Sequence, residues 1–173
     1  MNPMSRRFTR CRSRSFGGWV ALPGLLALLA LPAAAQPAAT PAPVPPGYDE
    51  ALARRVGADD MGMRSYVLVV LKTGPNRMPA GPDRDAMFRG HFANMKRLAD
   101  EGKLALAGPF DGVDGWRGLF VFAVKDIEEA RSLTATDPVI ASGEMVAEFH
   151  RYYGSAALML VPETHDKVAK KRF

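Results

Sequence analysis

Cysteine and histidine are scarce in this 173-residue sequence. Its only cysteine, Cys11, lies in an arginine-rich N-terminal segment that we predict is removed. The remaining chain can then form no disulfide and no thiol-based site, so a hydrophobic core must hold the fold together. The three histidines, His91, His150 and His165, show no zinc-binding spacing. Because phosphate-binding glycine loops and serine-nucleophile motifs are also lacking, we predict neither a metal nor a cofactor.

Acidic residues are absent from the first 18 residues, which instead contain five arginines. A short apolar run over 19–31 follows, and three alanines at 33–35 supply small residues for cleavage. This order is typical of a secretory signal peptide, so we predict that residues 1–35 are removed after Ala35. The alternative is an uncleaved anchor, but a span needs about 20 apolar residues. We therefore expect membrane contact only during export, and a mature protein that is periplasmic or secreted.

A surplus of basic charge is also absent once that segment is set aside. Of the 23 lysines and arginines, five lie in residues 1–35, which leaves 18 against 18 aspartates and glutamates. A neutral chain offers no basic footprint for nucleic acid, so we predict no such partner. Four basic residues near the C-terminus are expected to form a solvated tail: Lys167, Lys170, Lys171 and Arg172.

Alanine and proline dominate the stretch that follows the predicted cleavage site. We assign residues 36–62 to a linker. Within it, the pattern over 48–56 is compatible with one or two helical turns capped by Asp49. The sequence then predicts one globular domain over 63–154, which is long enough for one modest core, and a C-terminal extension over 155–173.

The domain alternates strand-like and helix-like patterns. Apolar, β-branched-rich runs predict strands at 66–71, 104–107, 118–124 and 144–152. One helix is expected from a cap at Asp83 to a stop at Gly102, and a second from Asp126 to just before Asp137. Alternation in the last strand places Glu144 on its wetter face. The order β-α-β-β-α-β predicts a ferredoxin-like α+β fold with both helices on one face of an antiparallel sheet.

Strands one and three are apolar on both of their faces. Two helices cover only one face of a four-stranded sheet, so the other face would expose a large apolar patch. Such a patch marks an interface. We therefore predict a homodimer in which the helix-free faces of two copies pack together.

One histidine, His91, lies on the apolar stripe of the first helix. Phe88, His91, Phe92 and Met95 follow the spacing of a single helical face, so the imidazole points inward and needs a partner. In the predicted topology, the first half of this helix meets the exit of the second helix, where Asp137 stands. A carboxylate there would orient the imidazole, and we expect the two side chains within hydrogen-bond reach.

The same edge of the sheet collects the end of strand one and the turn between strands two and three. A few polar groups that converge on one edge predict a small-molecule site. Its expected residues are His91 and Asp137 as the catalytic pair, with Lys72, Gly108, Pro109, Phe110 and Trp116 as binding residues.

Several of these residues have purely structural alternatives. Asp137 precedes Pro138 and is equally suited to cap a turn or helix. Phe110 and Trp116 would either stack on a ligand ring or fill core space. Gly108 and Pro109 fit the end of a strand better than a ligand contact.

Four separated motifs resemble the YciI-like (YCII-related) domain family. They stand at 90–92, 102–104, 107–110 and 136–138, and the resemblance covers about residues 64–153. It implies a dimeric α+β barrel and a His–Asp catalytic pair at His91 and Asp137. Relatives in the wider superfamily include isomerases, lyases and cofactor-free oxygenases. The N-terminal segment, the linker and the C-terminal extension lie outside the family pattern.

These observations together predict an exported, cofactor-free enzyme of lyase or isomerase type that acts on a small organic molecule. The alternative is a non-catalytic dimeric module that binds a small ligand or a protein in the same place.

Overall fold

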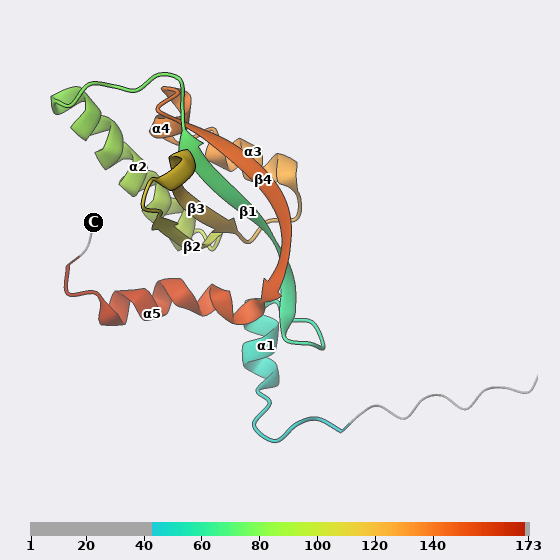
Figure 1. The fold of residues 1–173 in the computed structure, drawn as a ribbon. Helices are drawn as coiled ribbons and strands as arrows, with labels where there is room; N and C mark the ends of the chain where they lie inside the picture. Colours follow the sequence, from blue (N-terminus) through green and yellow to red (C-terminus); the bar gives the residue numbers. More distant parts are fainter. Residues whose placement is uncertain (1–42, 172–173) are drawn as a thin grey trace, which may run out of the picture. The chain divides into compact units, whose positions relative to one another are not determined.

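The computed structural model describes residues 43–171. The predicted signal peptide and Arg172 lie outside the described residues. Along the described chain the elements are α1 (Glu50–Val56), β1 (Met63–Thr73), α2 (Pro82–Asp100), β2 (Leu104–Pro109), the 3-10 turn η1 (Val113–Gly115), β3 (Trp116–Phe122), α3 (Ile127–Thr134), α4 (Pro138–Ala141), β4 (Met145–Ser155), the 3-10 turn η2 (Ala156–Leu160) and α5 (Val161–Val168) (Figure 1).

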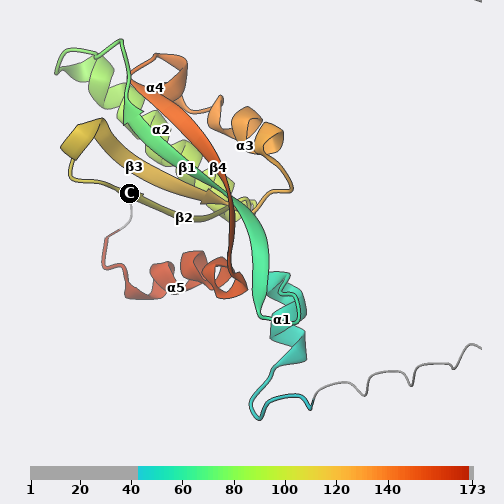
Figure 2. The ribbon, with the colours of Figure 1, turned by 45° about the vertical axis from the view of Figure 1, so that its right-hand side comes forward.

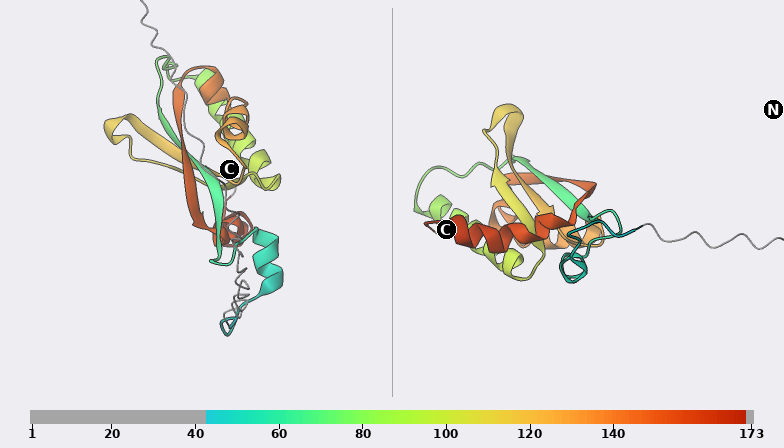
Figure 3. Two further views of the ribbon diagram at one scale, coloured as in Figure 1. Left: turned by 90° about the vertical axis from the view of Figure 1, so that its right-hand side faces the viewer. Right: turned by 90° about the horizontal axis from the view of Figure 1, so that it is seen from below.

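The four strands form one antiparallel sheet in the order β2-β3-β1-β4. This order confirms the predicted ferredoxin-like α+β fold. β1 and β4 are the longest pair, with eleven residues each, and they twist together along the sheet (Figure 2). Both α2 and α3 lie on one side of the sheet, while the β2–β3 hairpin projects to the other side (Figure 3, left).

The main core lies between the sheet and these two helices. Alternate residues of β1 point toward the helices, as expected for a strand with period two. The buried members of this core are Val67, Val69, Leu71, Met87, Leu98, Leu104, Phe120, Phe122, Val124, Ala130, Val139 and Met145. It fixes the register of α2 and therefore the direction in which His91 points.

Two of the predicted helix caps are confirmed and one is wrong. The Asp49 and Asp126 side chains accept hydrogen bonds from the Leu52 and Glu129 N–H groups, as N-caps do. Asp83, in contrast, lies inside the first turn of α2, because the helix begins one residue earlier at Pro82, with Gly81 as its N-cap. Proline is favoured at the first helical position, where its missing N–H has no partner to lose.

The helix-free face of the sheet is partly covered by the chain itself. Leu158 and Met159 of η2 pack against a second cluster on this face, formed by Tyr66, Ala105 and Val121. Figure 1 shows α5 running from the end of β4 past the lower end of the sheet. The C-terminal extension therefore contributes a folded segment, which the sequence did not predict. Among the described helices, none is long and apolar enough to cross a membrane.

Candidate active site

His91 and Asp137 are in direct contact. The Nδ1 atom of His91 lies 2.8 Å from Oδ2 and 3.0 Å from Oδ1 of Asp137. Both residues are buried, with exposed fractions of 7% for His91 and 0% for Asp137. The predicted hydrogen-bond contact between the two side chains is therefore confirmed.

Asp137 is held in place by its own position at the start of α4. Its Oδ1 atom accepts a hydrogen bond of 3.1 Å from the Val139 N–H, as an N-cap residue does. Capping and contact with His91 thus occur together in one carboxylate. An ionised carboxylate only accepts hydrogen bonds, so beside such a carboxylate we expect the proton between the two groups on Nδ1 of the imidazole. In the neutral ring, Nε2 then carries the free lone pair.

Contacts on both sides of the pair fix the segment 136–138 against α2. Thr136 donates to Oδ1 of Asn94 at 3.1 Å, and Arg97 donates to the Thr136 hydroxyl at 3.2 Å. On the other side, a Cβ added at Gly90 would lie 3.0 Å from Cγ of Pro138. Glycine at position 90 therefore allows the close approach of α4 that brings Asp137 to His91.

Replacing Gly90 with alanine is expected to lower the free energy of unfolding by about 1 kcal/mol. In a free helix the same change would stabilise by about 1 kcal/mol, because alanine has the higher helix propensity. At this position the new methyl group would displace Pro138 and lengthen the contact between Asp137 and His91. Thermal or urea denaturation measures the change.

The double variant with Pro138→Ala is the matched control, because it removes the Cγ atom that the new methyl group would meet. The loss caused by Gly90→Ala should then shrink or reverse. An equal loss with and without Pro138 would contradict the close-approach account.

Three phenylalanine rings surround the imidazole. Their ring centroids lie 5.3 to 6.0 Å from that of His91: Phe88, Phe92 and Phe120. Among the described residues, Nε2 of His91 makes no hydrogen bond, and the only fully buried side-chain polar atom without a partner is Nε of Arg64. Nε2 therefore keeps some solvent-accessible surface, in agreement with the 9% exposure of the His91 side chain. An approaching molecule would meet this nitrogen within an aromatic surround.

A buried glutamate supports the N-terminal half of α2. Glu144 is 0% exposed and accepts hydrogen bonds from Arg84 at 2.8 Å and from the Met78 N–H at 2.7 Å. Burial alone would raise the pKa of Glu144, but the hydrogen bonds from Arg84 and Met78 outweigh it and lower the pKa below its ordinary value. The guanidinium of Arg84 also lies over the Phe88 ring, at 4.7 Å from its centroid. Glu144 is thus linked to the Phe88 ring beside His91 through Arg84, which contacts both residues.

The prediction that Glu144 lies on the wetter face of the last strand is wrong. β4 begins at Met145, so Glu144 precedes the strand and does not follow its alternation. Sequence analysis assigned no site role to Phe88, Phe92 and Phe120. Phe92 was expected on the inward face of α2 but is 38% exposed. A glutamate that follows a glycine just before a strand is too weak a signal to predict a buried carboxylate that binds Arg84 and the Met78 N–H.

The structure divides the predicted site into two groups. Lys72, Phe110 and Trp116 gather around the β2–β3 hairpin: the Lys72 Nζ lies 5.8 Å from the Trp116 ring centroid, and the Phe110 and Trp116 centroids lie 5.4 Å apart. No hydrogen bond, ion pair or ring contact within the described chain joins these three residues to His91 or Asp137. The hairpin projects to the side of the sheet away from α2, the helix that carries His91 (Figure 3).

Gly108 and Pro109 serve the sheet rather than either group. Both are paired in β2, opposite Leu119 and Gly118. A Cβ at Gly118 would lie 2.8 Å from the Gly108 carbonyl oxygen, so the two strands approach closely here. Their strand-end role, which the sequence also suggested, is the one that the geometry supports.

Comparison with known proteins places this site within a family. Residues 65–149 match the model of the YCII-related domain, and this segment contains His91, Asp137 and Glu144. The domain of this chain therefore belongs to the YCII-related family.

Two similar proteins illustrate the range of the comparison. The chain is 37% identical to the "Uncharacterized protein YjpA" of Bacillus subtilis (strain 168) over 54 residues, and these residues make up 31% of this chain. The match spans about three fifths (61%) of the length of that relative. A solved structure, 5-chloro-2-hydroxyhydroquinone dehydrochlorinase (TftG) from Burkholderia phenoliruptrix AC1100 in complex with 2,5-dihydroxybenzoquinone, aligns with a TM-score of 0.37 and 17% identity, over 50% of this chain and 92% of that one.

Proposed function

We propose that this protein is a cofactor-free enzyme of lyase or isomerase type, in which His91 moves a proton on a small organic molecule and Asp137 orients it. One observation carries the proposal: Nδ1 of a buried imidazole lies 2.8 Å from a buried carboxylate oxygen, while Nε2 makes no hydrogen bond in the described chain. This is the arrangement of a general base with its orienting group.

The chemistry needs few further groups. Nε2 accepts a proton from an acidic C–H or O–H of the substrate, and the Asp137 carboxylate stabilises the imidazolium that forms. Return of the proton to another carbon completes an isomerisation. Its delivery to a leaving group as the C–X bond breaks completes an elimination. The three phenylalanine rings around His91 favour a small, largely apolar or aromatic substrate over a highly charged one.

Proton transfer can be tested before the substrate is known. The full chain is incubated in D2O with a panel of small carbon acids, including enolisable keto acids and dihydroxybenzenes, and deuterium incorporation is followed by NMR. The proposal expects one class of compound to exchange faster with the protein than with buffer. The alternative, a non-catalytic module that binds a ligand at the same place, expects chemical-shift changes of the ligand without exchange.

Export, as predicted from residues 1–35, would place the reaction in the periplasm or outside the cell. Mass spectrometry of protein from the native host tests the export prediction, and a mature N-terminus at Met1 would contradict it.

We also propose that two copies pair through the part of the helix-free face that the C-terminal segment leaves open. Val146 and Tyr152 of β4 are more than 40% exposed there, although both side chains are largely apolar. Leu68, Leu106 and Leu119 of the same face are only partly buried. An apolar surface of this kind is stabilised by burial against a second copy.

Replacing Val146 with glutamate is expected to convert the dimer to a monomer. The substitution puts a second negative charge next to Glu148 on the proposed interface, where burial against another copy would remove its hydration. Light scattering at micromolar concentration should report twice the monomer mass for the wild type and the monomer mass for the variant. Ala93→Glu, an exposed change on α2, is the control and should remain dimeric. A wild type that is monomeric at this concentration would rule out the pairing.

A further inference from the structure

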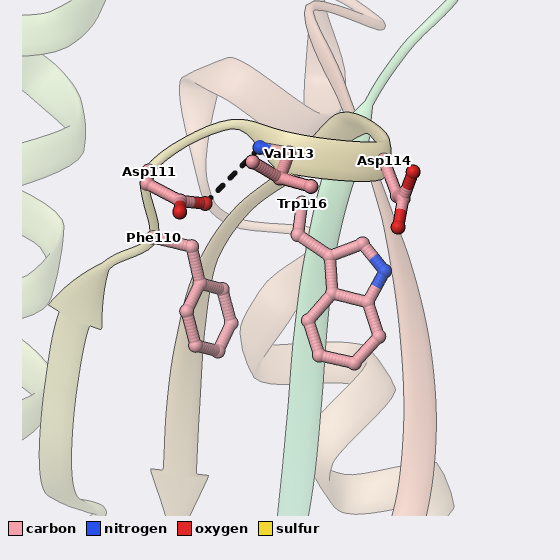
Figure 4. A pocket seen from close by; sticks show the side chains of 5 residues that line it. All are labelled: Phe110, Asp111, Val113, Asp114 and Trp116. Atoms are coloured by element: carbon pink, nitrogen blue, oxygen red, sulfur yellow. Dashed lines mark hydrogen bonds between the residues drawn. The ribbon is translucent and has the colours of Figure 1, made fainter.

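The β2–β3 hairpin carries a pocket that the proposed chemistry of His91 does not use. Its volume is about 290 Å³, and it is lined by Phe110, Asp111, Val113, Asp114 and Trp116. Figure 4 shows the two aromatic rings side by side and pointing the same way from the two strands, with Val113 above them and one carboxylate on each side of the loop. All five lining residues belong to the β2–β3 hairpin and its turn. This hairpin projects to the side of the sheet away from α2 and α3 (Figure 3).

In the single chain, the walls of this hairpin pocket are aromatic faces that remain accessible. They lie on the same side of the sheet as the surface through which we propose that two copies pair, because Lys72 stands opposite both Trp116 and Val146. The Phe110 and Trp116 rings lie at 60° to each other with centroids 5.4 Å apart. Trp116 is 41% exposed, which is high for a tryptophan that already contacts two neighbouring side chains. The faces of such rings carry negative partial charge and attract cations, and tryptophan does so most strongly. The protein itself uses this property, because the Lys72 ammonium lies 5.8 Å from the Trp116 ring centroid.

The charges at the rim of the pocket are negative. Asp111 uses one oxygen to accept from the Val113 N–H at 3.1 Å, and in the described chain Asp114 has no hydrogen bond or ion pair. Lys72 does not neutralise them, because its ammonium is paired with Glu148 at 2.7 Å. Two carboxylates therefore flank two aromatic rings without a matching cation of their own.

We propose that the hairpin pocket binds a small organic cation, an alkylammonium or quaternary ammonium group, against the exposed surface of the contacting Phe110 and Trp116 rings and beside the carboxylates of Asp111 and Asp114. The proposal goes beyond the function assigned to His91 and Asp137 and does not depend on it. A pocket of about 290 Å³ accommodates a group of the size of trimethylammonium.

The test is an NMR titration of the full chain with choline and with its neutral isostere 3,3-dimethylbutan-1-ol. Amide shifts of residues 110–116 report binding. Saturable binding is expected, about tenfold tighter for choline, because only the cation gains from the ring faces and the carboxylates. Trp116→Leu is expected to weaken choline binding by about fivefold. The double variant Asp111→Asn and Asp114→Asn should weaken it by about threefold or more, while asparagine at 111 keeps the acceptor for the Val113 N–H.

Three results would overturn the proposal: shifts that do not saturate, equal affinity for choline and the alcohol, or unchanged affinity in the double asparagine variant. His91→Asn separates the two sites. It should bind choline as the wild type does, whether or not His91 transfers protons, and a loss of choline binding in this variant would show that the pocket is not a site of its own.

Discussion

Replacing Glu144 with alanine is expected to lower the free energy of unfolding by about 3 kcal/mol at pH 7. The change leaves the Arg84 guanidinium and the Met78 N–H without their buried acceptor, and loss of one partner of a buried charged pair costs several kcal/mol. It also removes the hydrogen bond that holds the N-terminal end of α2 at Arg84, two turns before His91. Urea denaturation followed by circular dichroism measures the loss.

The pH dependence gives this prediction a second check. The pKa of Glu144 is lowered in the folded protein, so its ionised form stabilises the fold above the pKa of an unfolded glutamate, about 4.3. That contribution is lost as the pH falls through the folded pKa. The gap in stability between the wild type and Glu144→Gln should therefore be largest at neutral pH and should close in acid.

Glu148→Gln, four residues further along the chain in β4, is the matched control. The side chain of Glu148 is 49% exposed and pairs with Lys72 at the surface, so its loss should change stability little. A stability gap for Glu144→Gln that stayed constant down to acidic pH would contradict the assignment of a buried, ionised carboxylate.

Replacing His91 with asparagine is expected to reduce proton transfer by about 100- to 10,000-fold, the usual contribution of a general base. Asparagine places its amide nitrogen near the position of Nδ1, so the hydrogen bond to Asp137 can be kept while Nε2 is removed. The ring atoms that are lost leave a small gap among Phe88, Phe92 and Phe120, with an expected cost of about 1–2 kcal/mol. The deuterium-exchange assay and a denaturation curve measure the two effects separately.

His91→Gln is the complementary variant. Glutamine reaches toward the Nε2 position and removes the donor that faces Asp137, so it leaves a buried carboxylate with one partner fewer. It should lose more stability than the asparagine variant, by about 2–3 kcal/mol. Retained exchange in a well-folded His91→Asn protein would show that His91 is structural.

Local patterns were sufficient to predict the fold and the contact between His91 and Asp137. Both depend on signals that act over short stretches: the period of apolar residues in α2, the caps at Asp126 and Asp137, and the order of elements, which leaves one sensible topology. Since His91 and Asp137 are 46 positions apart, it was topology rather than spacing that joined them.

Direct contact of Lys72, Phe110 and Trp116 with His91 is not seen in the described chain, for a reason that lies in the sheet. An end of a sheet has two faces, and the order of elements does not say on which face a side chain lies. An irregularity between Leu71 and Lys72 shifts the register so that Trp116 stands opposite Lys72. Such a shift of one residue moves a side chain to the other face, and no local pattern announces it.

The folding of the C-terminal segment also escaped prediction. Leu158 and Met159 have no clear partner in the sequence, because the surface that they cover is assembled from three strands. Contacts of this kind depend on tertiary structure, and propensity alone does not reveal them.

The most direct test of the His91–Asp137 pair is the protonation of the His91 ring, measured by ¹⁵N NMR on the full chain, with His91→Asn used to assign its signals among those of the three histidines. The account predicts that the neutral ring carries its proton on Nδ1, toward Asp137, and leaves Nε2 bare. A neutral ring with its proton on Nε2 would turn a lone pair toward the carboxylate, leave no base facing a substrate, and contradict the proposed role of His91.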